Sequence, residues 1–216
     1  MLKPRLLSGL SFALGLVSLL PSLSGCATAV VATGGVGALA LHDRRSFGTL
    51  TDDESTEWKA AARLPEKYRD SAHLNFTSYN RKLLITGEVP NEQARQEIQA
   101  SLRGIEGIRQ IHDESAVMPP SSLAARSRDS LTDAKVKARL IEDKQLSANH
   151  IKVVTERGTT YLMGLVGERE SKIAIEIART TDGVRRVVSL FEILSDAELR
   201  RHAPPPASPP APVESR

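Results

Sequence analysis

The chain has 216 residues, of which 40% are hydrophobic, 25% are charged and only 4% are aromatic. These proportions exclude an intrinsically disordered chain and a protein with many membrane spans. The formal charge is +3, from 29 basic and 26 acidic residues. So small a positive charge, with so few aromatic side chains to stack on bases, argues against nucleic acid as a partner.

Residues 1–25 predict a signal peptide. Lys3 and Arg5 precede an almost uninterrupted apolar run from Leu6 to Leu20, and no acidic residue occurs in the segment. Cleavage after residue 25 leaves 27 basic and 26 acidic residues, a formal charge of +1. The processed chain is therefore close to neutral.

The single cysteine, Cys26, follows the sequence Leu-Ser-Gly at residues 23–25. This arrangement resembles a bacterial lipobox, in which the cysteine thiol receives a diacylglycerol and the new amino group is acylated. The resemblance implies lipidation of Cys26, with palmitate as a typical acyl group, whereas a buried thiol or a nucleophile is the less favoured reading. One acyl chain anchors a protein only marginally, so several chains would be needed to hold it on a bilayer. Because Ala27 is not the aspartate that retains such lipoproteins in the inner membrane, the resemblance implies the periplasmic face of the outer membrane.

Two segments are predicted to lie outside any folded core. Residues 26–49 predict the lipidated cysteine followed by a flexible tether of small residues. The glycines of this segment do not indicate a phosphate-binding loop, because the strand and helix that such a loop requires are not predicted around them. Residues 196–216 predict a proline-rich disordered tail, with half of the twelve prolines of the chain after residue 202.

Between these segments the sequence repeats, with residues 50–116 corresponding to 127–194. Each copy predicts a first helix (52–64 or 132–144), two strands around a short turn, a second helix (92–102 or 169–179) and a third strand. Residues 73–87 align with 150–164 at a constant offset, which places Gly87 and Gly164 at equivalent strand positions. Asp53 and Asp133 are predicted near the starts of the first helices, where carboxylates can cap free amides.

The repeat predicts the α+β class, with two tandem lobes that each contain a three-stranded mixed sheet packed against two helices in the order αββαβ. The expected boundaries are 50–117 for the first lobe, 118–126 for a linker and 127–195 for the second lobe. Each lobe is small enough for its own core to be marginal, so contact between the lobes is also expected.

The hairpin pattern apolar-x-Gly-x-Val, the charged helix after it and the Gly-Ile or Gly-Val at 107–108 and 183–184 resemble the BON domain. Two such domains behind a lipobox resemble the DolP (YraP) family of outer-membrane lipoproteins, from residue 43 to about residue 194. The resemblance implies a periplasmic, outer-membrane-anchored protein that binds anionic phospholipid, gathers at division sites and supports envelope integrity. It also implies outer-membrane assembly proteins or regulators of cell-wall hydrolases as protein partners.

The first helix of the second lobe carries two apolar stripes. Thr132, Val136 and Leu140 recur at four-residue spacing, which suits contact with the sheet. On the opposite side lie Leu131, Ala134, Ala138 and Ile141, flanked by Lys135, Lys137 and Arg139. This second stripe is either core or an interfacial face for anionic headgroups. Membership of the family would place phospholipid on this helix, although an aromatic residue typically stands where this chain has Leu131.

Charge favours the second lobe as the lipid-binding one. Residues 52–66 contain five acids and two bases, whereas residues 126–144 contain six bases and four acids. The predicted phospholipid-binding residues are therefore Leu131, Ala134, Lys135, Lys137, Ala138 and Ile141.

Enzymatic chemistry finds no support in the sequence. The five histidines show no metal-ligand spacing and no nucleophile elbow occurs. His73 and His150 occupy equivalent repeat positions, which favours a structural role. We therefore expect no catalytic activity, no metal and no cofactor. The alternative function is that of a periplasmic chaperone or adaptor for envelope proteins.

Overall fold

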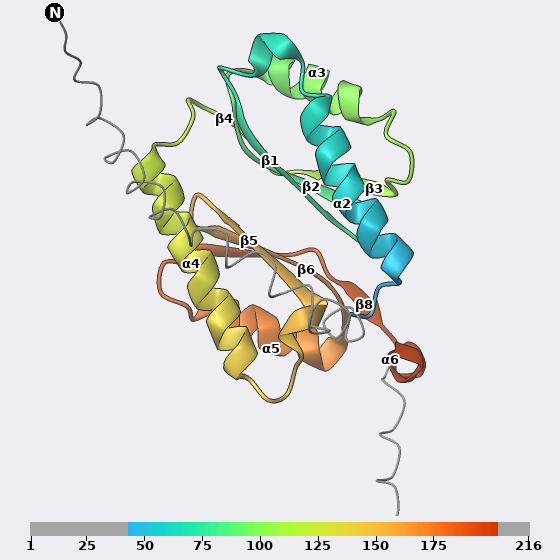
Figure 1. Ribbon diagram of the computed structural model, residues 1–216. Coiled ribbons are helices and arrows are strands. Elements are labelled where there is room, and N and C mark those ends of the chain that lie inside the picture. The colour runs from blue at the N-terminus through green and yellow to red at the C-terminus, as the bar shows by residue number, and fades with distance from the viewer. Residues whose placement is uncertain (1–42, 203–216) are drawn as a thin grey trace, which may run out of the picture. The chain divides into compact units, whose positions relative to one another are not determined.

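The computed structural model describes residues 43–202, which form two lobes of the same topology (Figure 1). The predicted signal peptide, Cys26 and most of the predicted tether, to residue 42, lie outside the described residues, as does the proline-rich segment from residue 203. The elements of the first lobe are α2 (Phe47–Ala62), η1 (Glu66–Tyr68), β1 (His73–Tyr79), β2 (Lys82–Val89), α3 (Glu92–Leu102), β3 (Gln110–Asp113) and β4 (Ala116–Val117). Those of the second lobe are α4 (Leu123–Glu142), η2 (Ala148–His150), β5 (Ile151–Glu156), β6 (Thr159–Gly167), α5 (Glu168–Arg179), β7 (Arg186–Ser189), β8 (Glu192–Leu194) and α6 (Asp196–His202).

Each lobe is built on a mixed sheet with the longest strand in the centre. In the first lobe β1 pairs antiparallel with β2, with Leu74 opposite Gly87, and β3 pairs parallel with β2. In the second lobe β5 and β7 pair with β6 in the same way. The predicted α+β class and the two tandem αββαβ lobes are therefore confirmed. The third strand is divided in both lobes, because β4 and β8 continue its pairing with the central strand after a short interruption.

Three elements differ from the expected boundaries. The helix α2 begins at Phe47 because Ser46 accepts a hydrogen bond from the Thr49 amide, and α4 begins at Leu123 because Ser122 accepts one from the Ala125 amide. The start of α4 therefore falls inside the segment expected to be a linker. The short helix α6 occupies the first residues of the expected tail.

The two hairpins share one feature, an aspartate in each lobe that binds the backbone of the turn. Asp53 is buried and accepts hydrogen bonds from the amides of Asn80 and Arg81, at 2.7 and 2.8 Å. Asp129 accepts bonds from the amides of Arg157 and Gly158, at 2.8 and 2.9 Å. These turn residues all have positive φ, so the carboxylates fix a tight turn that the backbone alone disfavours.

The expected role of Asp53 and Asp133 at helix starts was wrong. Asp53 lies in the second turn of α2 and binds the hairpin turn instead. Asp133 lies in the middle of α4, where it pairs with Lys137. Both errors follow from placing the helix starts too late, by five residues for α2 and by nine residues for α4.

In each lobe an apolar core lies between the sheet and two helices, which are α2 and α3 in the first lobe and α4 and α5 in the second (Figure 1). A third apolar cluster joins the two sheets, and it consists of Tyr79, Leu84, Tyr161, Met163 and Leu165. Tyr79 also donates a hydrogen bond from its hydroxyl to the carbonyl oxygen of His150, at 3.1 Å. Burial raises the pKa of Tyr79 to about 12, so the hydroxyl keeps this proton at neutral pH. The expected contact between the lobes is therefore present.

Within residues 43–202, no helix combines the length and the apolar character needed to cross a bilayer.

Candidate functional site

The helix α4 buries one of its two apolar stripes and exposes the other. Thr132, Val136 and Leu140 face the second sheet and retain at most 6% of their accessible surface. Leu131 is 59% exposed and Ile141 is 72% exposed. Of the two readings that the sequence left open, the structure therefore excludes a core role for this stripe.

The exposed stripe covers the second half of α4. Ala134 and Ala138 are exposed between Leu131 and Ile141, and Leu123 extends the same face at the start of the helix with 78% exposure. We call Leu123, Leu131, Ala134, Ala138 and Ile141 the apolar strip. From Leu131 to Ile141 these apolar side chains recur on one exposed face, and such groups mark interaction surfaces more often than isolated side chains do.

The cations predicted beside the strip have three different environments. The Lys135 ammonium lies 2.7 Å from the carboxylate of the exposed Asp182, and this hydrogen bond lowers the pKa of Asp182. Lys137 pairs with Asp133 at 2.6 Å and remains exposed. Both ammonium groups lie in solvent-accessible ion pairs, which are worth little and can exchange partners readily.

Arg139 does not belong to the exposed edge of the strip. Its guanidinium donates to the carbonyl oxygen of Ile177 at 2.9 Å and to the hydroxyl of Thr181 at 2.8 Å. These bonds tie α4 to the end of α5, so Arg139 is a structural contact rather than a cation available to a ligand.

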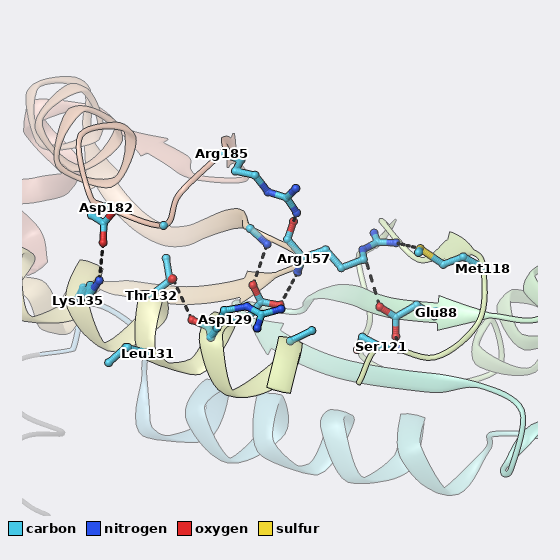
Figure 2. A pocket seen from close by; sticks show the side chains of 14 residues that line it. Glu88, Met118, Ser121, Asp129, Leu131, Thr132, Lys135, Arg157, Asp182 and Arg185 are labelled. Atoms are coloured by element: carbon cyan, nitrogen blue, oxygen red, sulfur yellow. Dashed lines mark hydrogen bonds and ion pairs between the residues drawn. The ribbon is translucent and has the colours of Figure 1, made fainter. Parts of the chain in front are cut away.

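A groove of about 660 Å³ opens beside Leu131, and its labelled side chains are shown in Figure 2. Its wall is formed by α4, by the turn at Arg157 and by the loop that contains Asp182 and Arg185. The groove is lined by four cationic side chains, Arg128, Lys135, Arg157 and Arg185, and by three carboxylates, Glu88, Asp129 and Asp182, so the cations exceed the anions by one. We refer to this feature as the basic groove.

Two of these cations are well placed for an anionic ligand. Arg128 is exposed on α4, and its side chain makes no hydrogen bond or ion pair within residues 43–202. Arg185 donates to the carbonyl oxygen of Arg157, so its guanidinium is held at the groove. One guanidinium group can donate two parallel hydrogen bonds to the oxygens of a phosphate, so this arrangement suits a phosphate-bearing headgroup.

Sequence reasoning missed the basic groove. Arg128 lies in the expected second lobe but before the residues that were predicted to form its first helix. Arg157 and Arg185 belong to loops that are far from Arg128 in the sequence. The available signal was the match of Arg157-Gly158 to the turn Asn80-Arg81 of the first lobe, which places Arg157 at a hairpin turn.

The first lobe exposes apolar side chains on its own first helix. Phe47 is 77% exposed and Trp58 is 74% exposed on α2. The surroundings of this face are acidic, because Asp52 and Glu54 are exposed on the same helix. An anionic membrane surface would repel these carboxylates, so α4 is the better candidate.

The fold and the repeat define a protein with two BON domains. The sequence profile of the BON domain matches residues 52–119 and 128–195. The chain is 33% identical to the outer membrane lipoprotein DolP of Haemophilus influenzae over 174 residues, which are 80% of this chain and 90% of that protein. It is 30% identical to the 21 kDa hemolysin of Actinobacillus pleuropneumoniae over 69% of this chain and 78% of that protein. Identity to the osmotically-inducible protein Y of Escherichia coli is 26%, over 65% of this chain and 72% of that protein.

With two BON domains and this similarity over nearly the whole of a DolP lipoprotein, the chain belongs to the DolP family of outer-membrane lipoproteins.

Proposed function

We propose that this protein is anchored to the periplasmic face of the outer membrane by lipids on Cys26 and binds anionic phospholipid through α4 of its second BON domain. The observation that carries the proposal is the apolar strip, exposed along α4 and bordered by the basic groove. The strip suits the upper acyl region of a bilayer, and the groove suits the phosphate layer above it.

The energies of the two parts explain why an anchor is needed. Complete burial of Leu131 or Ile141 would contribute about 1.5–3 kcal/mol each, and a helix lying in the interface buries such side chains only in part. Each cation near an anionic surface adds about 1 kcal/mol. Binding by the folded part alone is therefore weak, and the acyl chains on Cys26 provide most of the membrane residence.

The proposed site differs in one respect from the predicted set of residues. Leu131, Ala134, Lys135, Lys137, Ala138 and Ile141 remain its proposed members, and Arg128, Arg157 and Arg185 join them. A role at division sites and in envelope integrity is proposed on the family resemblance. The chaperone or adaptor function stays as the alternative, because the same apolar strip could bind a protein.

Flotation of the fragment 41–216 with vesicles tests this proposal. The fragment contains both lobes and lacks Cys26. We expect it to float with vesicles that contain phosphatidylglycerol and to remain at the bottom of the gradient with pure phosphatidylcholine. Equal behaviour with both vesicles would contradict a preference for anionic lipid, and binding of a stoichiometric protein partner in the absence of lipid would favour the adaptor.

Neutralising the basic groove should weaken this binding without disturbing the fold. The double change Arg128→Gln and Lys135→Gln removes two exposed charges that each add about 1 kcal/mol, so partition to anionic vesicles should fall up to about 30-fold at low salt. The difference should shrink at 0.5 M salt because charge interactions are then screened. Lys172→Gln is the matched control, because Lys172 is an exposed lysine of α5 in an ion pair with Glu168. If the double variant and the control bind alike, the groove takes no part.

A further inference from the structure

The junction between the lobes contains a buried cluster of one imidazole and two carboxylates. His73 lies on β1, Glu88 lies directly opposite it on β2, and Glu156 reaches the same point from β5 of the other lobe. One ligand atom from each of the three residues lies within 4.8 Å of the others. The ligands of one tetrahedral metal ion lie about 3.4 Å apart, so small movements of these side chains would bring all three atoms to the usual distance of about 2.0–2.1 Å from a single ion.

Both carboxylates are withdrawn from solvent, and each has one oxygen held by an amide. Glu88 is fully buried and Glu156 is 4% exposed. The Ser121 backbone donates to Oε2 of Glu88 at 3.2 Å, and His73 Nδ1 lies 3.1 Å from the same oxygen. The Asn75 side chain donates to Oε2 of Glu156 at 2.9 Å. Bonds of this kind orient carboxylates around a metal ion.

The second oxygen of Glu88 is the independent sign of a missing partner. Oε1 is buried and receives no hydrogen bond from the described residues, and the Arg157 Nε atom lies 4.0 Å from it. A buried carboxylate oxygen without a hydrogen bond is costly. The ligand atoms of Glu88 and Glu156 lie within 4.8 Å of each other, so a cation between them would offset the repulsion of two buried negative charges.

Comparison of the two lobes shows that the cluster is not required by the fold. The repeat offset matches His73 with His150, Glu88 with Leu165 and Glu156 with Tyr79. Leu165 and Tyr79 belong to the apolar cluster between the sheets. The same junction is thus built with an apolar and an aromatic side chain on one side and with two carboxylates on the other.

We infer that His73, Glu88 and Glu156 form a site for one divalent transition-metal ion, of which zinc is the best-fitting example. One imidazole with two carboxylates is a ligand set that zinc accepts, whereas magnesium and calcium prefer oxygen ligands alone. A pocket of about 240 Å³ lined by His73, Asn75 and Glu156 gives the ion a route from solvent. Since the ligands come from both lobes, the bound ion would lock the lobes together. The site shares no residue with the apolar strip, but Glu88 also lines the basic groove and lies 4.0 Å from Arg157, so the metal site borders the proposed lipid site.

Metal analysis of the full chain, purified in detergent and stripped with a chelator, tests this inference. After dialysis against zinc chloride, the wild-type chain should retain about one zinc ion, and its melting temperature should rise by several degrees, since an ion that binds only the folded state stabilises it. Magnesium chloride should produce neither effect. Wild-type chain with less than a tenth of an equivalent of zinc would overturn the inference and leave His73 and Arg157 as the partners of Glu88.

Substitutions at the cluster separate a true site from adventitious zinc. His73→Ala and the pair Glu88→Gln with Glu156→Gln should each lower zinc affinity by about tenfold or more. His73 is partly exposed, so its variant should stay folded even if the buried double variant does not. The control is His150→Ala, which removes the matched histidine beside Leu165 and should bind zinc as the wild type does. If His73→Ala retains the wild-type affinity, the cluster is not the binding site.

Discussion

Gly87→Val should lower the free energy of unfolding by about 3–5 kcal/mol. Gly87 has φ of +112°, and a Cβ atom there would lie 2.0 Å from the carbonyl oxygen of His73 on the neighbouring strand. Valine would therefore combine backbone strain with a clash against backbone atoms that cannot move without breaking the β1–β2 pairing. For a domain of this size the melting temperature should fall by about 10 °C or more, as thermal denaturation followed by circular dichroism would show.

Two further glycines calibrate this expectation. Gly164 is the repeat counterpart of Gly87, and a Cβ atom there would lie 2.4 Å from the carbonyl oxygen of His150. Because Gly164 does not have a positive φ, Gly164→Val should lower the free energy of unfolding by less, about 2–3 kcal/mol. Gly107 has φ of +88° with nothing within 4 Å of a Cβ atom, so Gly107→Val isolates the strain at about 1–2 kcal/mol. Gly87→Val melting no lower than Gly107→Val would show that the close approach of the strands is not limiting.

Cys26→Ala should abolish incorporation of labelled palmitate and remove the protein from the outer-membrane fraction. Lipidation requires the thiol of Cys26. Each buried methylene of an acyl chain contributes about 0.8 kcal/mol, so a diacylglycerol with an additional acyl chain anchors a protein far more firmly than the partial burial of Leu131 and Ile141 can. Cell fractionation combined with metabolic labelling measures both effects at once.

Ser24→Ala is the matched control for the anchor, because it changes the same segment and leaves Gly25 and Cys26 in place. We expect this variant to take up label and to remain in the outer membrane. A wild-type chain that takes up no palmitate would refute the lipoprotein anchor, whatever the location of the Cys26→Ala variant.

The fold could be predicted from the sequence because the repeat is long and each copy contains a hairpin formed by residues close in sequence. The constant offset between residues 73–87 and 150–164 marks two copies of one hairpin, and a hairpin is defined by residues close in sequence. The start of α4 could not be placed in the same way. Its first turns, Leu123 to Ser130, lack the apolar period of the later turns and follow Pro119 and Pro120, so only the cap at Ser122 marks the helix.

The candidate site was predictable only in its helical part. The helical period separates the Leu131 face from the Val136 face, but it does not reveal which face meets a neighbouring element. That information depends on the tertiary arrangement, as does the position of Arg157 and Arg185 beside Arg128. The same reason hid the cluster of His73, Glu88 and Glu156, whose members come from three strands and two lobes.

The central claim is that the apolar strip of α4 binds the membrane, and it is tested most directly by the double variant Leu131→Glu with Ile141→Glu in fragment 41–216. Both side chains are exposed, so each change should alter the free energy of unfolding by no more than about 0.5 kcal/mol. Two carboxylates on the face that meets acyl chains and anionic headgroups should abolish flotation with phosphatidylglycerol vesicles.

Trp58→Glu is the matched control, since it places the same carboxylate on the exposed face of the first helix of the other lobe. Measured side by side by flotation and thermal melting, all three proteins should melt alike, and only the double variant of α4 should stay behind when anionic vesicles float. A double variant that melts like the wild type and still floats with it, or a Trp58→Glu variant that loses binding in its place, would contradict the assignment of the membrane surface to α4.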